Sequence, residues 1–156
     1  MSQTNKITSS IIQQRLEAIV SEMGEAMLRT AYSQILNSSR DFSTAIFDGK
    51  GRLVAQADHI PLHVGALPYA VRSIIDAFGD SIAPGDLFLL NDPYFGGNHL
   101  PDVTAFVPVF APGAETPAFW TINRSHQSDI GGSTHGSYNP GATEIWQEGI
   151  RIPPIR

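Results

Sequence analysis

Two glycine-rich loops each carry a histidine and an aspartate three residues apart. The first loop contains His99 and Asp102, and the second contains His126 and Asp129. Each loop follows a segment that is typical of a β-strand. Imidazole nitrogens and carboxylate oxygens are ligands that Zn²⁺, Mn²⁺ and Fe²⁺ accept in proteins. If the two loops meet, their side chains could bind one divalent metal ion, although the residue types permit a metal without establishing one.

A second pair of histidines, His59 and His63, lies four residues apart. Pro61 stands between them and disfavours a helix that would present both imidazoles on one face. We therefore expect both histidines at the edge of the site, where they accept a proton or orient the ligands.

Several common catalytic devices are absent from the sequence. There is no G-x-x-x-x-G-K-[ST] phosphate loop, no strand leads into a G-x-G-x-x-G helix, and there is no G-x-S-x-G elbow. Ser125, His126 and Asp129 are too close in sequence to form a hydrolase triad. The chain has no cysteine, which removes thiolate catalysis and cysteine-based metal sites.

The composition is that of an ordinary globular chain. Its 156 residues predict a single domain over 1–156. A formal net charge of −5 disfavours nucleic acid and anionic membrane surfaces as partners, because binding phosphates requires clustered Lys and Arg. We expect no signal peptide and no membrane span, and hence a cytoplasmic protein.

Apolar residues recur at three- and four-residue spacing near the start of the chain. They predict a long amphipathic helix from Ile12 to Ala31, with Ser9 or Ser10 as its cap and residues 37–39 as its end. We expect this apolar stripe to pack in the core. An exposed stripe would instead favour a subunit contact.

The remaining elements predict an α+β fold with a mixed sheet, a β-hairpin and a second helix. The turn Asp48-Gly49-Lys50-Gly51 is typical of a hairpin, because glycine tolerates positive φ. The two long glycine-rich loops would then carry the metal site. The predicted ranges are 42–47 and 52–57 for the hairpin, 67–78 for the helix, and 87–90, 103–110 and 118–123 for further strands.

Five stretches of the chain resemble the hydantoinase B/oxoprolinase family, and together they extend over essentially the whole sequence. The middle two long motifs, residues 91–103 and 125–132, are specific. The matching stretches are Arg40-Asp41-Phe42-Ser43, His63-Val64-Gly65, residues 91–103, residues 125–132 and residues 148–154.

The resemblance implies a divalent metal, Zn, Mn or Fe, bound by Asp41, His99, Asp102 and His126. Asp41 comes from the resemblance alone, since its position would equally suit an ion pair with a neighbouring arginine. The resemblance also implies a hetero-oligomer with a separate ATP-binding hydantoinase A/oxoprolinase A subunit. Family B subunits are longer, so the chain is expected to be the N-terminal, metal-bearing part of one.

The expected function is that of the B component of an ATP-dependent hydrolase of a hydantoin, 5-oxoproline or another lactam. Phosphorylation of the amide oxygen on the partner would make the ring carbon electrophilic, and the metal would activate water to attack it. Asp129, His59 or His63 would accept the proton or orient the ligands. Two alternatives stay open: the alpha-type component of an ATP-dependent ketone carboxylase, and an assembly fragment without activity.

Overall fold

The structure is a computed structural model that describes residues 3–57, 60–137 and 139–156. Three α-helices, five strands and four short 3₁₀ helices make up its described part. The α-helices are α1 (Gln3–Thr30), α2 (Gln34–Ser39) and α3 (Pro61–Phe78). The strands are β1 (Phe42–Asp48), β2 (Leu53–Gln56), β3 (Phe88–Leu90), β4 (Asp102–Phe110) and β5 (Pro117–His126). The 3₁₀ helices are η1 (Gly79–Ser81), η2 (Pro93–Phe95), η3 (His135–Ser137) and η4 (Ile145–Gln147).

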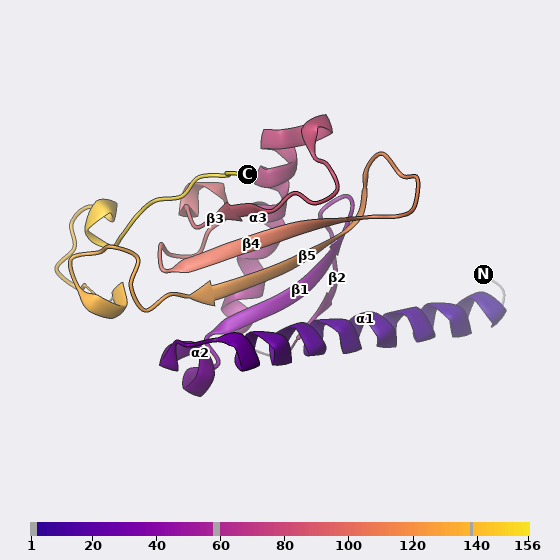
Figure 1. Cartoon of the computed structure of the whole chain (residues 1–156), viewed down its shortest axis with the longest axis horizontal. Helices are drawn as coiled ribbons and strands as arrows, with labels where there is room; N and C mark the ends of the chain where they lie inside the picture. Colours follow the sequence, from indigo (N-terminus) through magenta and orange to yellow (C-terminus); the bar gives the residue numbers. More distant parts are fainter. Residues whose placement is uncertain (1–2, 58–59, 138) are drawn as a thin grey trace.

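The five strands form one sheet in the order β2-β1-β5-β4-β3 (Figure 1). Every pairing between these described strands is antiparallel, so the α+β class is confirmed but the expected mixed sheet is wrong. Hairpin connections join β1 to β2 and β4 to β5, and they produce antiparallel neighbours directly. Strand β5 lies at the centre of the sheet, between β1 and β4.

The predicted hairpin is confirmed, with β1 and β2 joined through Asp48. The Asp48 side chain accepts hydrogen bonds from the backbone amides of Lys50 and Arg52, at 3.0 and 2.9 Å. Gly51 has a φ of 75°, a conformation that glycine adopts without steric cost. The turn thus closes through its own side-chain and backbone chemistry.

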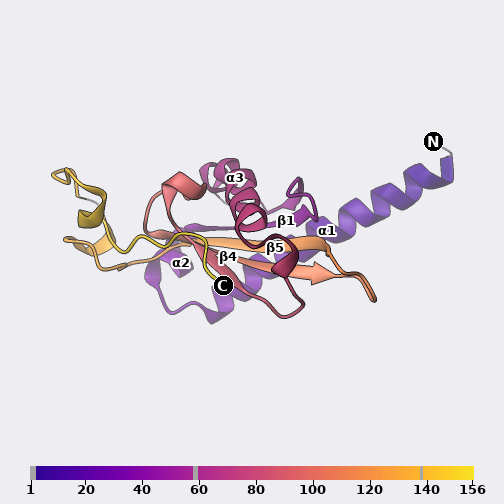
Figure 2. The ribbon, with the colours of Figure 1, turned by 90° about the horizontal axis from the view of Figure 1, so that it is seen from above.

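Helix α3 covers one face of the sheet (Figure 2). It contributes Leu67, Ala70, Val71 and Ile74 to a buried cluster with residues of β1, β3, β4 and β5. The helix begins at Pro61, well before the predicted range, and Pro68 lies inside it. Proline is tolerated in the first turn because its missing N–H needs no partner there, so Pro61 starts the helix.

Helix α1 packs against the opposite face, where Val20 forms a second cluster with Ile46 of β1 and with β2. The helix differs from its predicted bounds at both ends. Ser9 lies inside it and donates its hydroxyl to the Asn5 carbonyl, so it does not cap the helix. The chain leaves the helix after Thr30, and the separate helix α2 continues to Ser39.

The apolar stripe of α1 is only partly buried. Leu16 and Met23 pack against the Val20 cluster, whereas Ile12 and Ile19 are exposed. The first turns of α1 extend beyond the sheet in both views (Figures 1 and 2). In the described part of the chain, no helix is both long and apolar enough to cross a bilayer.

Candidate metal centre

Two neighbouring strands, and the residue that precedes a third, place ionisable side chains at one end of the sheet. Asp102 of β4 pairs directly with His126 of β5. Asp41 immediately precedes β1, and its carbonyl accepts the His126 amide at 3.0 Å. Alternate residues of a strand point to the same face of a sheet. These three positions therefore continue the face that α3 covers.

The two His-x-x-Asp loops meet at Asp102. Its Oδ1 lies 2.8 Å from His99 Nε2 and 3.2 Å from His126 Nδ1. The two imidazole nitrogens lie 3.2 Å from each other. The structure thus brings three expected metal ligands together around one carboxylate oxygen.

His63, in the first turn of α3, approaches the cluster from above the sheet. Its Nε2 lies 3.3 Å from Asp102 Oδ2 and 3.4 Å from Asp41 Oδ1. Asp41 Oδ2 lies 3.9 Å from His126 Nδ1, so Asp41 also joins the group. His63 faces both carboxylates with one ring nitrogen, an arrangement that suits the tautomer with its hydrogen on Nε2.

Burial in the site is graded. The Asp102 side chain is fully buried, and those of His63 and His126 are 5% and 12% exposed. Asp41 and His99 are 32% and 44% exposed. The carboxylate at the centre is therefore closed off, while one histidine and one aspartate are open to a ligand.

Asp102 is ionised despite its burial. Burial by itself raises the pKa of this carboxyl, but hydrogen bonds from His126, His63, His99 and Asn98 outweigh it and hold the pKa well below its usual range. Asn98 donates its side-chain amide to Asp102 Oδ2 at 2.9 Å. Hydrogen bonds to the charged form are the cause of such a shift.

The hydrogen bond to Asp102 raises the pKa of His126, and burial opposes the rise. The charges of Asp102 and Asp41 and a hydrogen bond with the Gly136 backbone act in the same raising direction. A backbone partner on a histidine ring fixes its orientation, as it does for metal-binding histidines in general.

The loop that carries His99 is fastened at its base by Asn91, whose side chain is fully buried. The Asn91 amide donates to the carbonyls of Leu100 and Ile150 at 2.7 and 2.8 Å, and its Oδ1 accepts from the Ile152 amide at 2.6 Å. One side chain thus joins both ends of the loop to the C-terminal segment.

The site opens into a hollow of about 660 Å³. Its lining residues are Ser39, Asp41, Ile60, His63, Asn98, His99 and His126.

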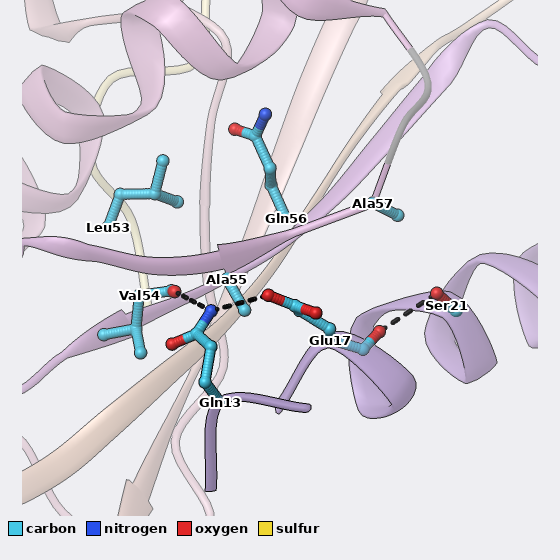
Figure 3. A pocket seen from close by; sticks show the side chains of 8 residues that line it. All are labelled: Gln13, Glu17, Ser21, Leu53, Val54, Ala55, Gln56 and Ala57. Atoms are coloured by element: carbon cyan, nitrogen blue, oxygen red, sulfur yellow. Dashed lines mark hydrogen bonds between the residues drawn. The ribbon is translucent and has the colours of Figure 1, made fainter. Parts of the chain in front are cut away.

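A second hollow, of about 540 Å³, lies between α1 and β2 (Figure 3). There Gln13 donates to the Val54 carbonyl and to Glu17, which is the one carboxylate among the lining residues. The second hollow therefore lacks the donor set of a metal site.

The donor set at Asp102 fits a divalent transition metal. Donor atoms at about 2.1 Å from one tetrahedral ion lie about 3.4 Å apart. The observed separations within His99, Asp102 and His126 are 2.8, 3.2 and 3.2 Å. Asp41 lies beside this group of three, with its Oδ2 3.9 Å from His126 Nδ1, and the three donor atoms of the group itself all lie within 4.8 Å of one another. Two imidazoles and two carboxylates match the preference of Zn²⁺, Mn²⁺ and Fe²⁺.

The other expected site residues differ in their placement. Asp129 is exposed, its Oδ1 accepts the Gly131 amide at 2.8 Å, and it is not among the residues that line the hollow. His59 lies outside the described residues. Asn98 and Arg124 were missed by sequence reasoning, although Arg124 stands two residues before His126 on the same strand and so on the same face.

Comparisons with known proteins support the sequence resemblance. The family model described as Hydantoinase B/oxoprolinase matches residues 5–156. The chain is 38% identical to caprolactamase subunit beta of Pseudomonas jessenii over 156 residues, all of this chain and 26% of that protein. It is 39% identical to 5-oxoprolinase 1 of Arabidopsis thaliana over 147 residues, 94% of this chain and 12% of that protein.

Solved structures share the fold. The crystal structure of ATP-dependent caprolactamase from Pseudomonas jessenii superposes with a TM-score of 0.88 at 38% identity, over 99% of this chain and 26% of that one. Nucleotide-free acetone carboxylase gives a TM-score of 0.88 at 23% identity, over 97% of this chain and 20% of that one, which shows a common fold only. The chain spans 26% or less of each of these proteins. Because the family model matches residues 5–156, the chain belongs to the hydantoinase B/oxoprolinase family.

Proposed function

We propose that the chain is the metal-bearing part of the B component of an ATP-dependent cyclic amide hydrolase. The observation that carries this proposal is the group formed by His99, Asp102 and His126, whose donor atoms lie within 4.8 Å of one another, with Asp41 beside His126. The relatives named caprolactamase and 5-oxoprolinase support a lactam or a 5-oxoproline-like ring as the substrate class, and the family description supports a hydantoin.

Asp41, His99, Asp102 and His126 would hold a divalent Zn, Mn or Fe ion. Such an ion supplies Lewis-acid chemistry, because it stabilises negative charge on oxygen and lowers the pKa of water. The partly exposed side chains of Asp41 and His99 line the hollow, so a ring of substrate size can reach this end of the sheet.

The chain's own residues prepare this site. Asp102 is ionised and fully buried, so it stays an acceptor at neutral pH. His63 Nε2 contacts Asp102 Oδ2 and Asp41 Oδ1, and these contacts orient both carboxylates. Asp129 and His59 remain the proposed proton acceptors. The exposed Asp129 would act from the loop that follows β5.

Hydrolysis of an unstrained lactam requires activation, because amide resonance stabilises the ring. Transfer of the ATP γ-phosphoryl group to the amide oxygen leaves ADP and an electrophilic ring carbon. Water adds to that carbon, the ring C–N bond breaks and a proton goes to nitrogen. Hydrolysis of the resulting acyl phosphate yields the open-chain amino acid and phosphate. The sequence has no phosphate loop, so we place the ATP step on a partner A subunit.

The test is an assay with the ATP-binding partner subunit. We expect the chain in its B component to open a lactam or hydantoin ring only when the partner and ATP are both present. Turnover of the ring without the partner would contradict the proposal. Carboxylation of a ketone in place of ring opening, tested in the same panel, would move the protein to the ketone carboxylase class.

A further inference from the structure

A fully buried arginine separates the apolar core from the metal site. Arg124 donates from Nε to the Thr104 hydroxyl at 2.7 Å. Its two terminal nitrogens donate to the backbone carbonyls of His63 and Gly96 at 3.0 and 2.9 Å. Among the described residues, no carboxylate lies within ion-pair distance of this guanidinium. Burial lowers the pKa of Arg124, and the charge of Asp102 opposes this shift.

The pairing of β1, β5 and β4 arranges the α3-covered face into three rows. The first row is apolar and belongs to the core, the second is polar, and the third is the candidate metal site. In the order β1, β5, β4 the rows are Ala45, Ile122 and Phe106; Ser43, Arg124 and Thr104; and Asp41, His126 and Asp102.

The polar row anchors the segments that lie over it. Ser43 donates its hydroxyl to the Ile60 carbonyl at 3.1 Å, just before α3 begins. Arg124 binds the carbonyl of His63 in the first turn of α3, and also the carbonyl of Gly96 in the loop that carries His99. One rigid side chain therefore ties two site segments to the sheet.

Arginine suits this role in a way that lysine does not. Its planar guanidinium presents donors in fixed directions, whereas a lysine ammonium is a single point of charge on a flexible stem. Three acceptors on three different segments, the Thr104 hydroxyl and the carbonyls of His63 and Gly96, need such a fork. Burying a cation whose hydrogen bonds all go to neutral acceptors costs free energy of folding. A contribution to the stability of the fold therefore does not by itself account for an arginine at this position.

We propose that Arg124 is a positioning residue for the metal centre. It holds the first turn of α3 and the Gly96 loop in one arrangement, and this fixes His63 and His99 relative to Asp102. The part of this inference that concerns metal binding rests on the proposed function, whereas the part that concerns the two segments does not.

The first test needs no metal. Hydrogen–deuterium exchange is measured on the metal-free natural chain, Arg124→Lys and the control Ile122→Ala. The control removes core volume from the same face of β5, one row away. We expect exchange in residues 61–66 and 95–99 to rise by about tenfold in Arg124→Lys relative to exchange in the strands of the sheet. Unchanged exchange in these two segments, or the same selective rise in Ile122→Ala, would overturn the inference.

The second test uses Co²⁺ as the probe, because its visible spectrum reports the arrangement of its ligands. We expect Arg124→Lys to weaken Co²⁺ binding by about 10–100-fold and to change the spectrum, while Ile122→Ala keeps the natural spectrum. A natural spectrum and affinity in Arg124→Lys would overturn the positioning role. If the natural chain binds no Co²⁺, the proposed function fails and the exchange result alone decides the inference.

A milder variant covers the case in which Arg124→Lys does not fold. Thr104→Val removes the hydroxyl that fixes Arg124 Nε and leaves the guanidinium in place. We expect faster exchange in the same two segments, by a smaller factor. Exchange equal to that of the natural chain in both segments would count against the inference.

Discussion

Asp102 and His126 are direct cross-strand partners of β4 and β5, and His126 Nδ1 lies 3.2 Å from Asp102 Oδ1. The register of two central strands therefore sets the centre of the site. A slip of one residue would turn either side chain to the other face of the sheet. The apolar pairs further along the same strands, such as Phe106 with Ile122, oppose this slip because they would lose their burial.

Replacing His99 should remove metal binding while the fold survives. The His99 side chain is 44% exposed, so His99→Ala should change the free energy of unfolding by less than about 1 kcal/mol. Metal affinity should fall by more than about a hundredfold, since loss of a residue that only hydrogen-bonds to a metal ligand already costs about 10–100-fold. Chemical denaturation and metal titration measure the two effects. The matched control is His135→Ala at an exposed position, and equal metal loss in both variants would refute the role of His99.

The stability of the metal-free chain should decrease as the pH rises from 6 to 8. The hydrogen bond to Asp102 raises the pKa of His126, so the folded state binds this proton more tightly than the unfolded state. The resulting stabilisation is present below the ordinary histidine pKa of about 6.5 and is lost as the pH rises through the folded value. Urea denaturation of the natural chain and His126→Asn tests this, and identical pH dependence in the two would show that His126 contributes nothing.

The same proton competes with the metal, because a ligand histidine must be neutral. Metal affinity should therefore increase between pH 6 and pH 8. Competition with a chelator of known affinity, repeated across this range, measures the trend. An affinity that does not change with pH would argue against His126 as a ligand.

Removing the Asn91 side chain should loosen the His99 loop from its base. Asn91→Ala leaves two carbonyls and one amide without their partner, at about 1–3 kcal/mol for each buried group, so we expect a loss of about 3 kcal/mol or more. Asn139→Ala is the control, since Asn139 makes comparable bonds in an exposed loop. Thermal unfolding compares them, and an equal loss in both variants would disprove the anchoring role of Asn91.

The same glycine-to-alanine change should have opposite signs at two positions. A methyl group at Gly97 would overlap the Asn91 carbonyl, so Gly97→Ala should destabilise the chain by about 1–3 kcal/mol. Gly65 lies on the exposed side of α3 with open space around it, so Gly65→Ala should stabilise by about 0.5–1 kcal/mol. Denaturant midpoints give both values, and a loss of stability at Gly65 would be the contrary result.

The sequence predicted the elements whose signals are local. The hairpin was found because the Asp48 turn closes through its own residues, and β3 was found from a short apolar run that follows a turn. The start of α3 was misplaced because Pro61 was interpreted as an obstacle to helix rather than as its first residue. The ends of α1 were misplaced because Ser9 and residues 31–33 carry no strong boundary signal.

The candidate site was predictable only where its members lie close in sequence. His99 and Asp102 share one loop, and their spacing pointed to each other directly. Asp41 reaches the group only through the pairing of β1 with β5, a contact between distant parts of the chain that no local pattern encodes. Arg124 was missed because a lone arginine in a strand gives no sign that its acceptors are backbone carbonyls of other segments.

The central claim is that this end of the sheet binds one divalent metal ion, and calorimetric titration of the metal-free chain with Zn²⁺ tests it most directly. The natural chain and Asp102→Asn are compared at neutral pH, with circular dichroism as the check that both are folded. We predict that the natural chain binds one ion and that Asp102→Asn binds none under the same conditions. No binding by the natural chain, or equal binding by Asp102→Asn, would contradict the account.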